Sequence, residues 1–336
     1  MRKSVFKSIS LLFLVAFAAG TVACTPVKRG EYASGSATIF CDDGFKNILD
    51  EEIEVFEFTY PQSSIIPFYV SEGEALDSLM ADATQAIITS RQLSKEQIDY
   101  MKSKYKRVVR QNPIAVDAVA LITNKKNPVD ALSVTEISDI LNGKITKWNQ
   151  LAGNDTTAIK VIFDNAESST VSYLKEKFLP EGKKISETVN AFAQSNNAAV
   201  FDVVKTDPNA LGVISVSWLG DDLSAAKKVP LDQRMADYKN ENDTVATNLT
   251  TEVKILKVSN PTEDNDFSPV SYKPYQAYIY SGEYPLVRKI YMVSTASNST
   301  VLHSFYVFMT GFVGQKIITK TGILPIHMNP RVVEVK

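Results

Sequence analysis

Cysteine and histidine are scarce in this chain, which has two of each among its 336 residues. His303 and His327 stand far apart, and neither has a cysteine or carboxylate nearby at metal-ligand spacing. A zinc site and a histidine-based catalytic triad are therefore not expected. The chain also lacks a Walker loop, a G-x-G-x-x-G sequence and an internal repeat of fixed period. We expect no cofactor, no metal ion and no enzymatic activity.

Excess charge of one sign is also missing. The chain has 36 Lys and Arg against 38 Asp and Glu, a formal net charge of −2. This balance does not indicate a nucleic-acid partner. A bound anion would have to be held by backbone amides and a few side chains, because the overall field does not attract it. The length suits two lobes of roughly 100–150 residues each.

The first residues have the layout of a secretory signal. Three basic residues precede a short apolar run, 11–19, which is too short to span a bilayer comfortably. The small residues 21–23 and then Cys24 follow, and a cysteine in this position resembles the lipobox of bacterial lipoproteins, although Thr21 stands where that family prefers leucine. We expect residues 1–23 to be the signal peptide, Cys24 to carry lipid and residues 24–36 to form a tether. The alternative is an ordinary signal peptide with a chance cysteine.

The lipoprotein hypothesis has two consequences. The protein would be periplasmic or on the cell surface, anchored to a membrane whose leaflet the sequence does not identify. Cys41 would be the one remaining thiol, so no intramolecular disulfide could form. Because Cys41 ends an apolar run, we expect it to be a small core residue.

Short apolar runs alternate with helical periodicity along the first third of the chain. Strands are predicted at 37–41, 65–69 and 85–88, and helices are predicted to begin near residues 44, 75 and 94. This alternation predicts an α/β fold with mostly parallel strands. Ligands of such sheets bind outside the carboxyl ends of the strands, which directs attention to the loops at 42–45, 70–73 and 89–91.

The rest of the chain continues the pattern. Pro113–Thr123 predicts a strand that leaves a first lobe for a second, and the polar loop 164–168 leads from a predicted strand into a helix near Ser169. Residues 231–266 are rich in Asn, Asp, Lys and Thr, which predicts surface strands and loops. Residues 301–310 and 312–319 are predicted to form one long helix or two short ones.

Several segments in a fixed order resemble the phosphate-binding proteins of ATP-driven importers, within the type II periplasmic-binding superfamily. The segments that carry the resemblance are Gly143–Trp148, Ser168–Thr170, Asn209–Ile214, Tyr284–Leu286, Gly314–Lys316 and Gly322–Pro325. The resemblance spans about residues 36–325 and implies two α/β lobes joined by two crossings, with the ligand in the cleft between them. Lobe 1 would hold residues 37–117 and 272–336, and lobe 2 would hold residues 118–271. We expect a monomer.

The resemblance also implies the ligand-binding residues. They lie on four loops and are Gly44 and Phe45; Ser71; Thr89, Ser90 and Arg91; and Ser168, Ser169 and Thr170. Helix-start amides and hydroxyl groups suit the oxygens of an anion, and arginine adds a charge-assisted contact. Each group has a plain structural alternative, which is a helix-starting glycine, a solvated cap, an exposed cation or an ordinary N-cap.

Three positions depart from the family pattern. Ser90 stands where the family has an aspartate that accepts the proton of phosphate, and Ala166 replaces another aspartate. Asp164 replaces an arginine and would repel a dianion unless another cation compensates. Arg91 is the candidate for that compensation.

The remaining acids near the cleft have ordinary interpretations. Adjacent carboxylates on a turn seldom face each other, so Asp42 and Asp43 do not suggest a glycosidase pair. We expect Asp43 to be a helix N-cap and Asp117 to be a hinge group.

The leading hypothesis is a receptor that captures phosphate by lobe closure and delivers it to the membrane subunits of an ABC importer. Three alternatives stay open. The same fold binds another oxyanion or a small organic anion; or the protein is a surface or adhesion lipoprotein that has lost its ligand; or it is a hydrolase, which lacks any supporting constellation of residues.

Overall fold

The computed structural model describes residues 34–183, 185, 190–220, 228–240, 248–260 and 270–326. The predicted signal peptide, Cys24 and most of the predicted tether lie outside these residues. Among the described residues, no helix has the length and apolar character needed to cross a membrane.

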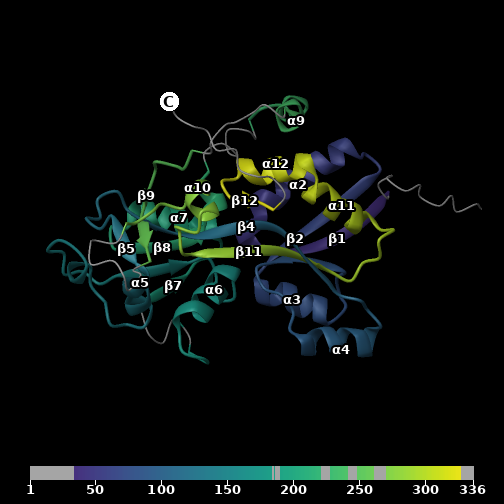
Figure 1. Cartoon of the computed structure of the whole chain (residues 1–336). Helices are drawn as coiled ribbons and strands as arrows, with labels where there is room; N and C mark the ends of the chain where they lie inside the picture. The colour runs from purple at the N-terminus through teal and green to yellow at the C-terminus, as the bar shows by residue number, and fades with distance from the viewer. Residues whose placement is uncertain are drawn as a thin grey trace, which may run out of the picture.

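One half of the molecule is built on three parallel strands. These are β1 (Gly35–Asp42), β2 (Ser63–Val70) and β3 (Ala86–Thr89), with β1 between the other two. One face of this sheet is covered by helices α2 (Lys46–Thr59), α11 (Val301–Thr310) and α12 (Phe312–Lys320), and the other by α3 (Glu72–Met80) and α4 (Lys95–Tyr105) (Figure 1). The apolar periodicity of these helices faces the sheet, which is why each strand–helix pair closes a core.

Two long strands join this half to the other. Strand β4 (Arg110–Thr123) and strand β11 (Val287–Ser294) run side by side through the centre of Figure 1. As far as Ala118, β4 pairs antiparallel with β11, and from Val119 onward it pairs with a strand of the other half. The point at which β4 changes partner lies between the two lobes, where a hinge belongs.

The second half repeats the design of the first. Its strands are β6 (Lys160–Phe163), β7 (Ala191–Ala193), β8 (Ala210–Ser215) and β9 (Lys254–Ile255), and its helices are α5 (Val134–Leu141), α6 (Ser169–Phe178) and α7 (Asn197–Thr206). Strand β6 pairs parallel with β7 and β8, whereas β8 and β9 pair antiparallel with β4. Strands β5 (Ala131–Ser133) and β10 (Lys257–Ser259) form a separate two-stranded sheet.

The remaining described elements are short. They are the 3-10 turns η1 (Asp43–Phe45), η2 (Trp148–Gln150) and η4 (Val216–Trp218), helices α9 (Leu231–Lys239) and α10 (Gln276–Tyr280), and strand β12 (Leu324–Pro325).

The α/β pattern and the parallel pairing within each half are confirmed. The antiparallel pairs arise because the strands that cross between the lobes enter each sheet against its direction. Cys41 is fully buried and free, as expected of a core residue.

Two local predictions were wrong. Residues 231–239 form helix α9, because Arg234 and Tyr238 anchor this polar segment to acidic residues of α2. The cap of the first turn is Asp42 rather than Asp43, since Asp42 Oδ1 accepts a hydrogen bond from Gly44 N at 3.0 Å. Helix α9 lies in the range predicted for lobe 2, yet it packs on α2 and α12.

Candidate functional site between the lobes

The two halves meet where β1 ends and α6 begins. Asp42 is the last residue of β1, and the chain turns directly after it through Gly44 into α2. On the other side, Ser168 caps α6 by accepting a hydrogen bond from Val171 N at 3.2 Å. The first N–H groups of a helix have no partner within the helix, so the amide of Ser169, like its hydroxyl, can bind a group outside α6.

Ser169 binds Asp42 across the junction. Its N–H donates to Asp42 Oδ2 at 3.0 Å, and its hydroxyl donates to Asp42 Oδ1 at 2.7 Å. Asp42 and Ser169 are both fully buried. The carboxylate thus lies at a helix N-terminus, where free N–H groups and the helix dipole favour negative charge.

Arg288 brings a cation to this junction from the hinge strand β11. It lies directly opposite Asp117 of β4, and its Nε donates to Asp117 Oδ2 at 3.0 Å. Its Nη1 donates to Ser169 Oγ at 3.1 Å, and its guanidinium lies 5.1 Å from the centroid of the Phe45 ring. Ser215 donates to the other oxygen of Asp117 at 2.9 Å. The guanidinium therefore contacts both hinge strands and the start of α6.

Buried acids surround this cation. Burial raises the pKa of Asp42 to about 7; the charges of Asp164 and Glu72 act in the same direction, while the Ser169 hydrogen bond and Arg288 partly oppose them. Burial likewise raises the pKa of Asp164, against hydrogen bonds and the charge of Arg288. Because two buried acids act on Asp42, this junction is sensitive to protonation and to the charge of a ligand.

Several buried polar atoms near the start of α6 have no hydrogen-bond partner among the described residues. They are Thr170 Oγ1, Asp164 Oδ1 and Asn197 Oδ1. Asn197 Nδ2 donates to the other oxygen of Asp164 at 3.1 Å. Unsatisfied buried polar groups cost free energy and are expected to receive a partner.

Gly44 is needed at this junction. A Cβ atom there would lie 2.7 Å from Asp42 Oδ1 and 3.6 Å from Ser169 Oγ. Any side chain would therefore push apart the groups that meet in the cleft. Gly44 also accepts a hydrogen bond from Trp218 Nε1 at its carbonyl oxygen, at 2.9 Å, which is another link between the halves.

The third predicted loop converges on Glu72 instead. Thr89 and Ser90 donate to Glu72 Oε1 at 2.7 and 2.8 Å, and Arg91 Nε lies 3.1 Å from Glu72 Oε2. Arg91 thus partners Glu72, and its side chain is 47% exposed. The prediction that Arg91 compensates Asp164 was wrong, because Arg288 is the cation whose charge acts on Asp164. Glu72 itself is fully buried.

Ser71 has a local role. Its hydroxyl accepts a hydrogen bond from Glu74 N at 3.1 Å and so caps α3. No contact in the described residues connects the Ser71 side chain to the groups at the start of α6.

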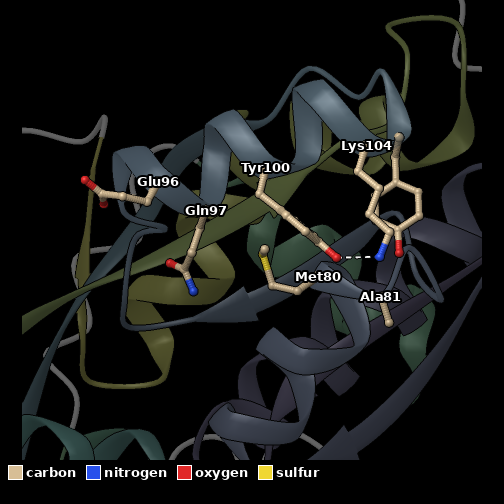
Figure 2. A pocket seen from close by; sticks show the side chains of 7 residues that line it. Met80, Ala81, Glu96, Gln97, Tyr100 and Lys104 are labelled. Carbon is tan, nitrogen blue, oxygen red and sulfur yellow. Dashed lines mark hydrogen bonds between the residues drawn. The ribbon is translucent and has the colours of Figure 1, made fainter.

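One other feature, an open groove, lies away from this junction. Figure 2 shows an open groove between the end of α3 and helix α4, lined by Met80, Ala81, Tyr100, Lys104 and their neighbours. Among the described residues, no group of three or more His, Cys, Asp or Glu side chains is placed to hold a metal ion.

Sequence reasoning missed Arg288 and Asn197. Arg288 lies within an apolar strand, and Asn197 is one of two adjacent asparagines at a helix start. A charged residue inside an apolar, strand-like run was the available signal for Arg288, since burial of an arginine requires a partner.

A family model described as a PBP superfamily domain matches residues 27–312. Among curated proteins, the phosphate-binding protein PstS of Borreliella burgdorferi is 23% identical over 288 residues, which cover 83% of this chain and 86% of that protein. PstS of Pseudomonas aeruginosa is 22% identical over 330 residues, covering 92% of this chain and 90% of its own.

Solved structures of the same fold include a putative phosphate ABC transporter substrate-binding protein from Clostridium perfringens with bound phosphate. It is 24% identical, covers 87% of this chain and 100% of its own, and superposes with a TM-score of 0.65. An ABC-type phosphate transport receptor from Vibrio cholerae is 20% identical with a TM-score of 0.59, covering 86% of this chain and 99% of its own. These likenesses establish the two-lobed α/β fold that the sequence predicts.

Proposed function

The chain belongs to the PBP superfamily domain family, and from this premise we propose that it is an extracytoplasmic solute-binding protein that captures phosphate by lobe closure and delivers it to an ABC importer. The curated relatives of nearly full coverage are named as phosphate-binding proteins. Capture requires no covalent chemistry, and we propose that the protein is not an enzyme. Anchoring through lipid on Cys24 and a monomeric state are parts of the same proposal.

The observation that carries the proposal is the start of α6 facing a buried arginine across the hinge. Ser169 offers an amide and a hydroxyl, Thr170 offers a buried hydroxyl with no described partner, and Arg288 offers a guanidinium already placed 3.1 Å from Ser169 Oγ. A helix N-terminus, hydroxyl groups and an arginine together make a typical binding site for a tetrahedral oxyanion.

The carboxylate of Asp164 disfavours phosphate, and the guanidinium of Arg288 can offset its charge. Asp164 occupies the family's arginine position and is buried, so an added anion needs a cation from elsewhere. We propose that Arg288 supplies it from β11, with Asp117 holding the guanidinium in place at 3.0 Å. The site would then keep the family's charge pattern with the cation moved to a different strand.

Closure follows from the position of these groups. Gly44 and Phe45 belong to the first half, Ser169 and Thr170 to the second, and Arg288 to β11, which pairs with β3 and β4. A ligand that contacts all of them gains its full set of contacts in the closed form alone, so it shifts the equilibrium toward closure.

A second ligand class has its own support. Asp42 and Asp164 are buried within reach of the charge of Arg288, and buried Glu72 acts on Asp42 as well. These acids would favour an oxyanion that carries a proton, or a small organic anion with donor groups. Such a ligand could hydrogen-bond to the acids that a fully ionised anion would meet with repulsion.

The test is a thermal-melt screen of the purified protein against phosphate, sulfate, other oxyanions and small carboxylates. A ligand that binds only the folded state raises the free energy of unfolding by about 2.7 kcal/mol at a hundredfold excess over Kd. We expect a shift with phosphate that Ser169→Asp abolishes, because the new carboxylate would repel the ligand. A shift with a different anion alone would move the proposal to that ligand, and no shift with any would favour the ligand-free surface lipoprotein.

A further inference from the structure

A carboxylate of the protein itself occupies the anion position at the start of α6. Asp42 receives three hydrogen bonds, from Ser169 N at 3.0 Å, Ser169 Oγ at 2.7 Å and Gly44 N at 3.0 Å. Helix α6 has ten residues, so its N-terminus carries a developed dipole. An oxyanion bound here would accept hydrogen bonds from the same Ser169 donors that Asp42 now uses.

The surroundings of Asp42 are not satisfied by this arrangement. Thr170 Oγ1 lies at the same helix start, and Asp164 Oδ1 and Asn197 Oδ1 belong to the segments beside it; all three are buried without a hydrogen-bond partner among the described residues. These two acceptor oxygens and this hydroxyl could pair with an occupant that is larger than a carboxylate and brings hydrogen-bond donors of its own. Asp42 fills part of the position and leaves part of its polar lining unpaired.

We infer that Asp42 is a built-in competitor of the ligand, which closes the lobes at the start of α6 in the ligand-free protein and is replaced there by the captured anion. This inference rests on the proposed function, since it concerns the same site. Asp42 belongs to lobe 1 and Ser169 to lobe 2, so the bond between them joins the lobes as a ligand would. The anion must exchange with Asp42, and its apparent affinity is lower by the fraction of molecules in which Asp42 has left.

Protonation of Asp42 would ease this exchange. The groups that act on it are Glu72 on α3, Asp164 before α6, Arg288 on β11 and the Ser169 hydroxyl; the two acids favour the protonated form, and the other two favour the charged form. With a pKa of about 7, Asp42 takes up a proton as the pH falls through neutrality. A neutral Asp42 is held less strongly by the helix start, so the anion displaces it more easily at pH 6 than at pH 8.

The test compares the protein with Asp42→Ala and with Asp42→Asn, which keeps the shape and removes the charge. Asp82→Asn is the matched control, because Asp82 is a lobe 1 carboxylate whose partner is Arg107, in the same lobe, at 3.0 Å. Phosphate affinity is measured by calorimetry at pH 6 and pH 8, and the radius of gyration without phosphate by small-angle scattering.

We expect both Asp42 variants to bind phosphate about tenfold more tightly than the unmodified protein at pH 8, and their advantage to shrink at pH 6. We also expect Asp42→Ala to be more extended than the unmodified protein without phosphate and to contract when phosphate is added. The Asp82→Asn control should match the unmodified protein in both measurements.

The outcomes separate this inference from the proposed function. Affinity that is unchanged or weaker in both variants, with the same radius of gyration, overturns the role of Asp42. If no protein binds phosphate but Asp42→Ala is still more extended, phosphate fails as the ligand while closure by Asp42 stands. Should Asp42→Ala fail to fold, the affinity and radius of Asp42→Asn decide the question alone.

Discussion

Two buried clusters in this molecule pair arginine with carboxylates, and they differ in how completely their polar atoms are satisfied. The α2–α9 cluster consists of Glu51, Glu54, Arg234 and Tyr238, and the interlobe cluster consists of Asp42, Asp117, Ser169 and Arg288. In the first, Arg234 Nη1 lies 2.5 and 2.6 Å from the two oxygens of Glu51, and Tyr238 donates to Glu51 at 2.8 Å. Every carboxylate oxygen of Glu51 therefore has a partner.

The interlobe cluster is built differently. The charge of Asp164 acts on Asp42, and buried polar atoms near these acids have no hydrogen-bond partner among the described residues. The α2–α9 cluster holds one helix against another and has nothing further to bind. The comparison teaches that pairing both oxygens of Glu51 suits a structural joint, whereas the interlobe cluster keeps polar atoms that a ligand could pair.

The largest effect is expected from breaking the complete cluster. Arg234→Ala removes the partner of Glu51, which would remain buried and charged, and loss of one member of a buried pair costs about 3–5 kcal/mol. Denaturant unfolding would measure the loss, and Glu54→Gln is the control, because Glu54 is 47% exposed and its removal should change little. Phosphate affinity of the folded variant should be unchanged. A loss below about 1 kcal/mol would mean that this network is not a structural joint.

Arg288→Gln should act on the ligand as well as on stability. Loss of a charge-assisted hydrogen bond of about 1.5–3 kcal/mol would weaken phosphate binding by about 10- to 100-fold. Calorimetry of Arg288→Gln and of the double variant Arg288→Gln/Asp117→Asn separates the two effects, since the double variant does not leave Asp117 as a buried unpaired charge. If the double variant bound phosphate with full affinity, Arg288 would stabilise the hinge without contributing to phosphate binding.

Glu52, next to Glu51 in sequence, gives a pH-dependent prediction. It is fully buried, neither of its oxygens has a partner among the described residues, and burial together with the charge of Glu51 raises its pKa well above the usual value. The folded state therefore binds a proton more strongly than the unfolded state does. The resulting stability is present below the unfolded pKa and is lost as the pH rises toward the folded pKa, at up to about 1.4 kcal/mol per pH unit.

Glu52→Gln removes this proton linkage. Unfolding free energies at pH 5 and pH 7 should fall more steeply in the unmodified protein than in the variant. The comparison with the variant is needed because Asp42, Asp117 and Asp164 also have raised pKa values and contribute the same trend. Equal slopes in both proteins would show that Glu52 reaches solvent or a partner.

Ser169→Ala should have the smallest effect. It removes a hydroxyl that donates to Asp42 and accepts from Arg288, but it keeps the backbone amide that donates to the anion position. A net hydrogen bond of about 0.5–1.5 kcal/mol corresponds to a change of about 2- to 10-fold in phosphate Kd. Thermal shifts over a phosphate titration would measure it. A loss as large as that of Arg288→Gln would place most of the recognition on this hydroxyl.

Much of the fold could be predicted because its signals are local. Residues 37–41 were predicted as a strand and lie within β1, and residues 301–310 were predicted as helical and form α11, since apolar periodicity acts within one element. Residues 231–239 were missed because nothing in their own sequence shows the buried Glu51 that holds Arg234. Tertiary contacts overrode the polar, loop-like composition of this segment.

The site divides in the same way. Ser168 and Ser169 could be found from the sequence, because a serine pair before a helical pattern predicts a helix start with free amides. The partnership of Arg91 with Glu72, and that of Arg288 with Asp117, could not be found, because each joins residues from separate strands or loops.

By itself, the sequence determined the α/β alternation, the long crossing strand and the helix start suited to an anion, since these depend on the spacing of apolar residues and on capping; its resemblance to a family implied the two lobes. Only the tertiary structure decided which cation lies in the cleft and that Asp42 binds at the start of α6. The physical reason is that electrostatic partnership depends on distance and burial, and both are set when segments more than a hundred residues apart are brought together.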